Sequence, residues 1–570
     1  MYSLRTIGTS LLALATTSLA ATVPELVERQ DSSCVHGPTT RNCWNDGFSV
    51  STNTDAKFPD TGKVVKYTLE VTSKTMSPDG VPRVMQVFNG QYPGPEIVAD
   101  WGDTLQITVK NSLADNGTSI HWHGFRQLHS NQMDGVNGLT ECPIAPGESK
   151  TYTFKATAYG GSWYHSHYSV QYAEGLIGPI TINGPSTANY DINLGTVPIT
   201  DWFDTPVFTI LAARPAAPPT AQSLLYNGTG VTGGVGTYAK TILTPGKKHK
   251  LTFANVGINQ YIHVSLDNHD FTVVAADLIP IEPYTTSSIV LSVGQRYDVI
   301  IDADQDVGNY WLRMTTGGGQ CDGPNQKNLN GDNFGAIFSY SGAPDGNPTS
   351  SASTMGAGCI EESNITPFVK TTVPSPSGSP TLLDLTLDTT AGVFWKVNGE
   401  AIDISWKTPT ISYVINGTYT LPANDNGLTI TGTGWSFWLM QNDTPLPHPI
   451  HLHGHDFWVV GYGAGSGAGA ALDLDNPPRR DTHTVDAGGY LIIAFPADNP
   501  GAWLMHCHIP FHISGGLGVQ FLERPEEIIS SIGPLDDYNG GCKSWAAYQD
   551  SIENFQQGDS GLKKRSFRQW

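Results

Sequence analysis

Eight of the 17 histidines in the chain occur as pairs separated by a single residue. On a β-strand, residues i and i+2 point to the same face about 6–7 Å apart, so each pair can present two imidazoles together. Imidazole is a good ligand for copper, zinc, iron and nickel. A lone histidine is usually a surface or hydrogen-bonded core residue, but four such pairs rarely occur without a metal. The pattern predicts a metal centre built from His121 and His123, His165 and His167, His451 and His453, and His506 and His508.

The last pair encloses a cysteine, Cys507, and two further histidines stand nearby. His512 follows Cys507 by five residues, and His448 precedes His451 by three. A trigonal site of two histidines and one cysteine with a weak axial neighbour is the blue-copper pattern, in which the thiolate carries an electron. The alternative is that Cys507 is a disulfide partner, which would leave another of the seven cysteines unpaired. Its position within a run of histidines favours copper.

The alternation of a strand adds a functional consequence. If residues 506–508 are extended, the sulfur of Cys507 points to one face and the flanking imidazoles point to the other. A copper on the thiolate would then be joined by two short covalent paths, on the order of 10 Å, to a cluster held by the paired histidines. Eight neutral ligands suit three coppers, and four coppers match the four single electrons that reduce O₂ to two waters.

The segments that carry these residues are predicted to be strands. Gly (62) and Pro (38) separate short runs rich in Val, Ile, Thr and Tyr, and residues 104–109 alternate apolar and polar side chains. A chain of 570 residues is too long for one ordinary domain of ~100–200 residues. The first and third regions of the chain each supply two histidine pairs, and the second supplies none. We expect an all-β protein of three consecutive sandwich or barrel domains, with the metal site between the first and the third.

The local composition of the chain predicts where its domains and processed segments begin and end. The N-terminus has a basic start, a short apolar core and small residues before a cleavage site, as in a secretory signal. A Ser/Gly/Pro/Thr-rich stretch separates the second and third regions. In order, we expect a signal at 1–20, a possible pro-segment at 21–29, domains at 30–184 and 185–342, a linker at 343–380, a third domain at 381–562 and a C-terminal tail at 563–570.

The protein is therefore expected to be secreted and extracellular. The net charge of −21 argues against a nucleic-acid partner, which would require a basic face. No apolar stretch approaches the ~20 residues of a membrane span. Each Asn-x-Thr triplet is weak evidence of glycosylation by itself. Such triplets begin at Asn116, Asn227, Asn364, Asn416 and Asn442.

The segments HWHG, HSH, HPIHLHG and HCHIPFH, in this order, resemble the copper signatures of multicopper oxidases, most closely those of ascomycete laccases. The resemblance covers essentially the whole chain. It implies three cupredoxin-like domains of the Greek-key type and four copper ions: one type 1, one type 2 and two type 3. The ligands it implies are His448, Cys507 and His512 for type 1; His121 and His451 for type 2; His123, His165 and His508 for one type 3 copper; and His167, His453 and His506 for the other.

The resemblance also implies a disulfide pattern and a processing site. Six cysteines allow 15 pairings, and their spacing alone does not choose among them. The family pattern leaves Cys507 free and implies that the tail is cut after Leu562. The implied disulfides are Cys34–Cys43, Cys142–Cys542 and Cys321–Cys359.

Two residues beside the ligands are assigned by the same resemblance. Leu517 stands ten residues after Cys507, at a position that resembles the axial one beside the type 1 copper. Methionine there would coordinate weakly and leucine cannot, and loss of an axial ligand generally raises the reduction potential. Asp134 lies where laccases carry an acid near the type 2 copper. The alternatives are an ordinary core leucine and an ordinary Asp-Gly turn.

The donor side is expected around His512 and Asn259. Related enzymes place in the second domain a carboxylate that accepts the phenolic proton, and the equivalent stretch here, 254–261, offers Asn259. Asparagine can hydrogen-bond a phenol but is a poor base, so no carboxylate is expected to assist phenol deprotonation there.

The resemblance implies a laccase, which couples one-electron oxidation of phenols or benzenediols to the reduction of O₂ to water. The alternative is a multicopper oxidase with another donor: ferrous iron, ascorbate or a pigment precursor. Ascorbate oxidases would require the axial methionine, which Leu517 replaces. A copper-binding protein or electron carrier without turnover is disfavoured, because all ten histidines and Cys507 are present. We expect a monomer that uses a small donor and O₂.

Overall fold

The computed structural model describes residues 34–552 apart from short internal gaps. The expected signal, the pro-segment and the tail after Leu562 lie outside the described residues. Within the described part, no helix is both long and apolar enough to cross a membrane. The gaps are 214–217, 318–320, 323–328, 330–334, 353–354, 356–357, 360–363 and 391.

The N-terminal domain consists of two four-stranded sheets, ordered β2-β1-β4-β6 and β3-β8-β7-β5. Alternation decides which side chains enter the core between them: Leu105, Ile107 and Val109 of β4 are fully buried, and their neighbours are more exposed. The strands are β1 (Val64–Met76), β2 (Arg83–Phe88), β3 (Ile97–Asp100), β4 (Thr104–Asn111), β5 (Ile120–Trp122), β6 (Ser149–Lys155), β7 (Gly160–Ser166) and β8 (Ile177–Asn183).

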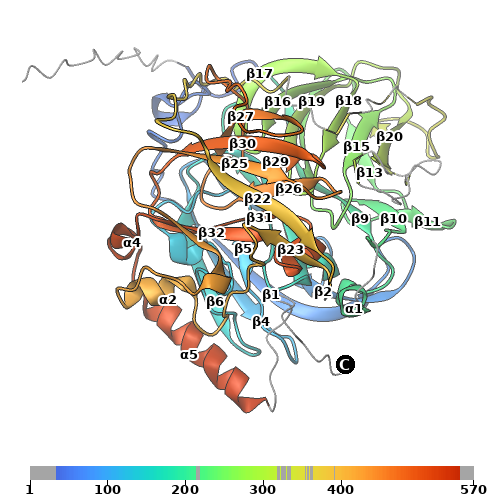
Figure 1. Ribbon diagram of the computed structural model, residues 1–570. Helices are drawn as coiled ribbons and strands as arrows, with labels where there is room; N and C mark the ends of the chain where they lie inside the picture. Colours follow the sequence, from blue (N-terminus) through green and yellow to red (C-terminus); the bar gives the residue numbers. More distant parts are fainter. Residues whose placement is uncertain are drawn as a thin grey trace, which may run out of the picture.

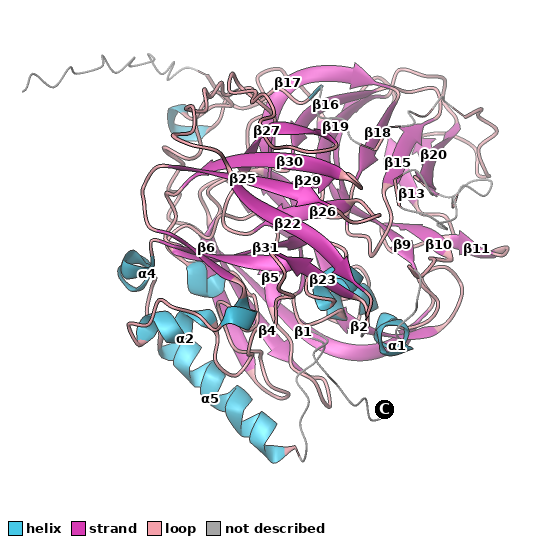
Figure 2. Cartoon of the chain, viewed as in Figure 1, coloured by secondary structure: helices cyan, strands magenta, loops and turns pink. Residues whose placement is uncertain are grey.

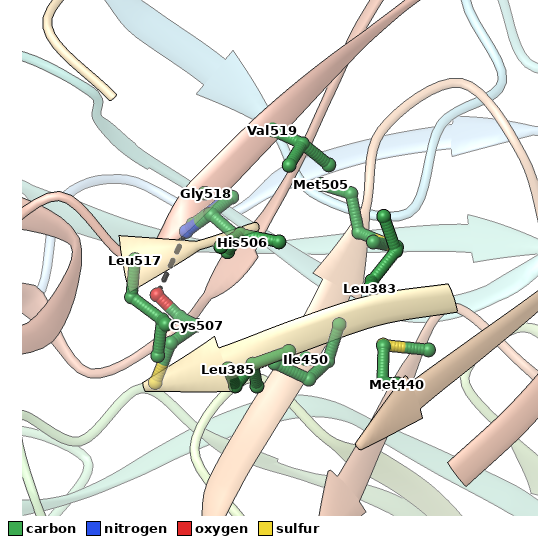
Figure 3. Close-up of a pocket in the computed structure, with 11 residues that line it drawn as sticks. Leu383, Leu385, Met440, Ile450, Met505, His506, Cys507, Leu517, Gly518 and Val519 are labelled. Atoms are coloured by element: carbon green, nitrogen blue, oxygen red, sulfur yellow. Dashed lines mark hydrogen bonds between the residues drawn. The ribbon is translucent and has the colours of Figure 1, made fainter. Parts of the chain in front are cut away.

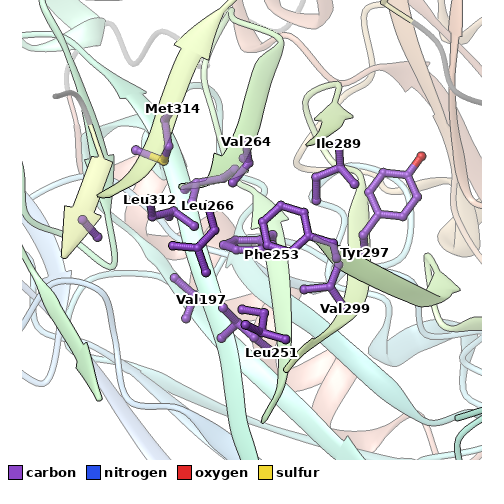
Figure 4. Close-up of a cluster of buried hydrophobic side chains, with 14 of the residues drawn as sticks. Val197, Leu251, Phe253, Val264, Leu266, Ile289, Tyr297, Val299, Leu312 and Met314 are labelled. Carbon is purple, nitrogen blue, oxygen red and sulfur yellow. The ribbon is translucent and has the colours of Figure 1, made fainter. Parts of the chain in front are cut away.

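The second domain pairs a six-stranded sheet, β10-β9-β14-β19-β16-β17, with a five-stranded sheet, β13-β21-β20-β15-β18. Its core is apolar and includes Leu251, Phe253 and Val299 (Figure 4). A hairpin of β11 and β12 and the short helix α1 (Val207–Ala213) lie outside these sheets. The strands are β9 (Ile192–Trp202), β10 (Ser223–Tyr226), β11 (Val231–Thr232), β12 (Val235–Gly236), β13 (Lys240–Leu243), β14 (Lys248–Asn255), β15 (Ile262–Leu266), β16 (Phe271–Ala276), β17 (Ile279–Thr286), β18 (Ser288–Leu291), β19 (Arg296–Asp302), β20 (Asn309–Thr316) and β21 (Gly335–Tyr340).

The third domain repeats the plan, with sheets β23-β22-β25-β30-β27-β28 and β24-β32-β31-β26-β29. Four helices belong to it: α2 (Thr410–Ile415), α3 (Pro510–Ser514), α4 (Pro525–Ser531) and α5 (Asp536–Ser551). The strands are β22 (Thr381–Asp388), β23 (Phe394–Val397), β24 (Gly427–Ile430), β25 (Trp435–Asn442), β26 (His448–Leu452), β27 (Phe457–Ala464), β28 (Arg479–Arg480), β29 (Thr482–Val485), β30 (Gly489–Pro496), β31 (Gly501–Cys507) and β32 (Gly518–Glu523).

The chain is thus dominated by strands arranged as three successive two-sheet units (Figures 1 and 2). This confirms the prediction of an all-β protein with three consecutive sandwich domains. The exact boundaries drawn from composition stay predictions.

The cysteines pair as the resemblance implies: Cys34 with Cys43, Cys142 with Cys542, and Cys321 with Cys359. Cys507 is free and buried. The Cys142–Cys542 bridge joins residues 400 positions apart and fastens α5 to the first domain, and in Figure 1 α5 runs along the outer edge of the molecule. Because six cysteines are used in these bridges, Cys507 is left available as a metal ligand.

Candidate metal centre

Strand register places the histidine pairs next to each other within each domain. In the first domain, His121 on β5 lies directly opposite His165 on β7. In the third domain, His451 on β26 lies opposite His506 on β31. Each domain therefore presents a patch of four neighbouring imidazoles on two adjacent strands.

The two patches meet across the interface between the first and third domains. The Nε2 atom of His508 lies 3.2 Å from Nδ1 of His123, and the rings of His167 and His506 are 5.4 Å apart. Potential ligand nitrogens within 4.8 Å of one another form three histidine sets. These sets are His121, His123 and His165; His121, His451 and His453; and His167, His453 and His506.

The structure therefore brings together all eight histidines that the sequence pairs predict. His167, His453 and His506 form a single set, as the resemblance implies. The rings of His123, His165 and His508 lie 5.0–6.0 Å apart, and those of His121 and His451 are 5.8 Å apart.

Most of these rings have one nitrogen committed to the protein and the other directed inward. Nδ1 of His121, His165 and His451 contacts a backbone carbonyl oxygen at 2.8–3.0 Å. Since a carbonyl only accepts, each Nδ1 carries the proton and each Nε2 has a free lone pair. These three Nε2 atoms are buried and have no hydrogen-bond partner among the described residues. Such fixed tautomers are typical of metal ligands.

The contacts of His453 and His506 test whether this cluster suits a bound metal ion. Nδ1 of His506 donates to the carbonyl of Cys507, and Nδ1 of His453 donates to the Asp134 carboxylate. Their Nε2 lone pairs consequently face each other at 3.2 Å. Burial lowers the pKa of both imidazoles well below the usual value, so a proton between them is disfavoured. A metal cation resolves this repulsion, and the donor set fits copper.

A second group of ligand atoms surrounds Cys507 on the other face of β31. The sulfur lies 3.4 Å from Nδ1 of His512 and 3.6 Å from Nδ1 of His448. All three residues are buried and form a potential metal site, with His448 from β26, Cys507 from the end of β31 and His512 from α3. His506 and His508, on either side of Cys507 in the chain, belong to the larger cluster. The predicted alternation of side chains along 506–508 is therefore present.

Leu517 lies beside this group, because its carbonyl accepts the backbone N–H of Cys507 at 3.1 Å (Figure 3). Leu517 and Cys507 border a void of about 10 Å³ that Met440 and Ile450 also line. This volume is at the lower limit for one water molecule, and the apolar walls offer water no set of polar partners. The side of Cys507 that borders this void is therefore apolar, whereas the sulfur itself faces the two imidazoles.

Three family models, each described as multicopper oxidase, match residues 70–187, 193–343 and 375–527. The laccase of Neurospora crassa is 44% identical, over 93% of this chain and 89% of its own length. Laccase-1 of Melanocarpus albomyces is also 44% identical, with the same coverage of both chains. The crystal structure of the Botrytis aclada laccase superposes with a TM-score of 0.87 at 38% identity, covering 93% of this chain and all of the other.

The chain belongs to the multicopper oxidase family. Within that family it is a laccase-type enzyme, and its three domains are cupredoxin domains. The family and the histidine clusters together imply bound copper ions.

Asp134 lies between the two halves of the oxidase's histidine cluster. One carboxylate oxygen is 2.9 Å from Nδ1 of His453 in the third domain, and the other is 3.2 Å from Nδ1 of His121 in the first. The turn that holds Asp134 requires Gly135, whose φ is +80° and whose added Cβ would clash with the carbonyl oxygen of Ile120. The acid is thus held against the cluster by the local backbone.

Sequence reasoning missed a second acid at the cluster. Asp481 lies 3.3 Å from Nε2 of His123, and its backbone carbonyl accepts from Nδ1 of His451. Burial alone would raise the pKa of this carboxyl, but Arg296 and His123 together lower it well below its usual value. Arg296 binds Asp481 through two hydrogen bonds of 2.7 and 2.6 Å from the second domain. The sequence holds no local signal for this pair, because its members are 185 residues apart.

Asn259 lies on the loop between β14 and β15. Ile258 packs in one apolar cluster with Phe511 and Phe203. The Asn259 side chain is nearly buried, and its backbone N–H donates to the carboxylate of Asp201 at 3.1 Å. The role of Asn259 on the donor side therefore stays a prediction.

Proposed function

We propose that this laccase-type oxidase holds four copper ions in the pattern that the sequence predicts. A type 1 copper would be held by His448, Cys507 and His512, and a three-copper cluster by the paired histidines. The observation that carries the proposal is that Cys507, the one free cysteine among the described residues, faces two histidine nitrogens while both of its neighbours join the interdomain cluster. The cluster ligands would be His121 and His451 for type 2, His123, His165 and His508 for one type 3 copper, and His167, His453 and His506 for the other.

When bound, the copper ions supply single-electron chemistry and the site at which O₂ is reduced to water. The chain's own part is to keep eight imidazoles neutral, oriented and dry. Burial lowers the pKa of His165, His167 and His508 well below the usual value, which keeps their nitrogens free for a metal. Leu517, which borders Cys507, has no ligand atom in its side chain, so a copper held there would be expected to have a higher reduction potential.

The electron donor would be a phenol or benzenediol that approaches His512. Relatives that carry the name laccase support this class of donor. Phe511, the half-buried neighbour of His512, would give an aromatic donor an apolar contact there. Asn259 would hydrogen-bond the donor without acting as a base.

Asp134 would hold and deliver protons that O₂ reduction consumes. Its carboxylate contacts His121 and His453, which come from opposite sides of the cluster. A carboxylate in this place would be positioned to pass a proton to a substrate bound between those histidines.

We further propose that the protein is secreted as a monomer after removal of 1–20 and of the tail 563–570. Three disulfides support an oxidising compartment. The predicted signal at the N-terminus supports export.

The first experiment is an absorption spectrum with copper counted per chain, followed by oxygen uptake with 2,6-dimethoxyphenol. We expect the intense blue band of a copper–thiolate bond, about four coppers and phenol-driven uptake. Cys507→Ser should lose the blue band and one copper, and phenol oxidation should fall to background. A matched control is Ser514→Ala, a buried change near His512 that removes no proposed ligand. A blue band that persists in Cys507→Ser would disprove the role of the thiolate, whereas intact copper with no phenol oxidation would move the donor to another class.

A further inference from the structure

In the fifth Asn-x-Thr triplet, Asn442-Asp443-Thr444, the asparagine and the threonine are buried. The exposed fractions of Asn442 and Thr444 are 0% and 3%. The Asn442 amide nitrogen donates to the carbonyls of Leu446 and Asp486, both at 2.8 Å. A glycan must be attached to that nitrogen and must project into solvent, so the folded protein has no room for one here. By contrast, Asn227, Asn364 and Asn416 are exposed.

The hydroxyl of Thr444 joins this amide to a proposed copper ligand. Oγ1 lies 2.7 Å from Oδ1 of Asn442 and 2.8 Å from Nε2 of His448. The Asn442 amide oxygen and the carbonyl of Leu446, 3.1 Å from the hydroxyl, both only accept, so they take up its single proton and its lone pair accepts N–H from His448. Nδ1 of His448 is therefore unprotonated, and it is the atom that faces the Cys507 sulfur at 3.6 Å.

We propose that this triplet is the outer hydrogen-bond shell of His448 and that Thr444 is a positioning residue for the type 1 copper. The inference rests on the proposed role of His448. An acceptor on the remote N–H of an imidazole ligand fixes its orientation and raises its basicity. A more basic ligand stabilises the oxidised copper, so Thr444 lowers the reduction potential, in the opposite sense to the effect proposed for Leu517.

A purely structural role for the triplet makes a different prediction. Asn and Thr side chains often close a turn on their own backbone, and the Asn442 oxygen indeed accepts the backbone N–H of Thr444 at 3.0 Å. Loss of such a turn alone would lower stability and leave the blue band and the potential unchanged. The potential therefore separates the two roles.

The test compares Thr444→Val and Thr444→Ser by redox titration of the blue band against a one-electron mediator. In Thr444→Val, the equilibrium should shift toward reduced copper by about five-fold, the worth of one ordinary hydrogen bond. Thr444→Ser keeps the hydroxyl and should titrate like the wild type. Thr418→Val is the matched control, since it removes the exposed triplet of Asn416 without touching the copper site. It should lose any glycan and keep the potential.

Peptide mass analysis of the wild type completes the test, with Asn442 expected to be unmodified. A glycan on Asn442, or a Thr444→Val protein that titrates as the wild type does, would overturn the proposal. If Thr444→Val does not accumulate, Thr444→Ala removes the same hydroxyl with a smaller side chain and undergoes the same titration. A wild type that lacks the blue band would instead refute the proposed function, so the two failures are distinguishable.

Discussion

At the scale of single residues, the metal centre depends on how each ring's second nitrogen is used. Backbone carbonyls fix His121, His165, His451 and His506, whereas Asp134 fixes His453. A carbonyl cannot be removed by substitution, but the Asp134 carboxylate can. Asp134 is therefore the contact through which the cluster can be probed with least change to its ligands.

Asp134→Asn should lower oxygen uptake by roughly 100-fold, because the amide cannot relay a proton. The blue band should stay, since the aspartate contacts the histidine cluster and not Cys507. Steady-state oxygen uptake and an absorption spectrum check both expectations, with the exposed Asp115→Asn as control. Turnover within a few-fold of the wild type would rule out the proton role.

The residues that the sequence could and could not predict differ in one physical respect. The ligand pairs are local. Alternation along an extended chain is enough to place Cys507 on one face and His506 and His508 on the other. Asp481 and Arg296 become neighbours only when the second and third domains meet, and neither stands in a recognisable spacing. Thr444 was visible only as part of a glycosylation triplet, because its contact with His448 depends on a turn.

At the scale of elements, the loop between β14 and β15 is organised by a buried acid. Asp201 on β9 accepts the backbone N–H groups of Ile258 and Asn259 at 2.6 and 3.1 Å. Tyr172 holds the same loop, because its hydroxyl lies 3.1 Å from the carbonyl of Gly257 and 3.0 Å from that of His508. The loop that carries Asn259 is thereby fixed to the strand end that carries the ligands.

Asp201 should give the protein a measurable pH dependence of stability. Burial raises its pKa to about 7, against 3.8 for an ordinary aspartate, even though the loop N–H groups oppose the shift. Between those two values the folded chain binds more protons than the unfolded chain, so the contribution of Asp201 to stability falls as pH rises. Relative to Asp201→Asn, the wild type should lose thermal stability between pH 4 and about 7 and change no further above it. A melting-temperature difference that is constant across this range would contradict the assignment.

At the scale of the whole molecule, charged residues join the first and third domains outside the metal centre. Asp55 accepts from Arg126 at 3.0 Å and from Arg479 at 2.7 Å. Arg479 also lies 3.3 Å from Asp456. Sequence predicted that these domains would meet, because both supply histidine pairs, but it could not predict which charges would line their contact.

Burial alone would raise the pKa of Asp55, yet the two arginines lower it to about 2. Its stabilisation is therefore complete above about pH 4 and lost as pH falls toward 2. Asp55→Asn should destabilise the protein near neutral pH by about 1.5–3 kcal/mol, the worth of hydrogen bonds to a charged group. Thermal unfolding at pH 6 and pH 2.5 should show the gap between variant and wild type shrinking in acid. A gap that widens in acid would be inconsistent with this ion pair.

The division of one histidine cluster between the first and third domains also constrains the order of events during biosynthesis. The first proposed ligand is His121 and the last is His512, so a ribosome adding about 5–20 residues per second needs roughly 20–80 seconds to make the stretch between them. Until that interval ends, the first domain carries only four of the eight paired histidines that the proposed cluster requires. A complete copper centre would therefore form only after nearly the whole polypeptide has been made, and a chain that ends before His448 would lack half of the proposed cluster ligands.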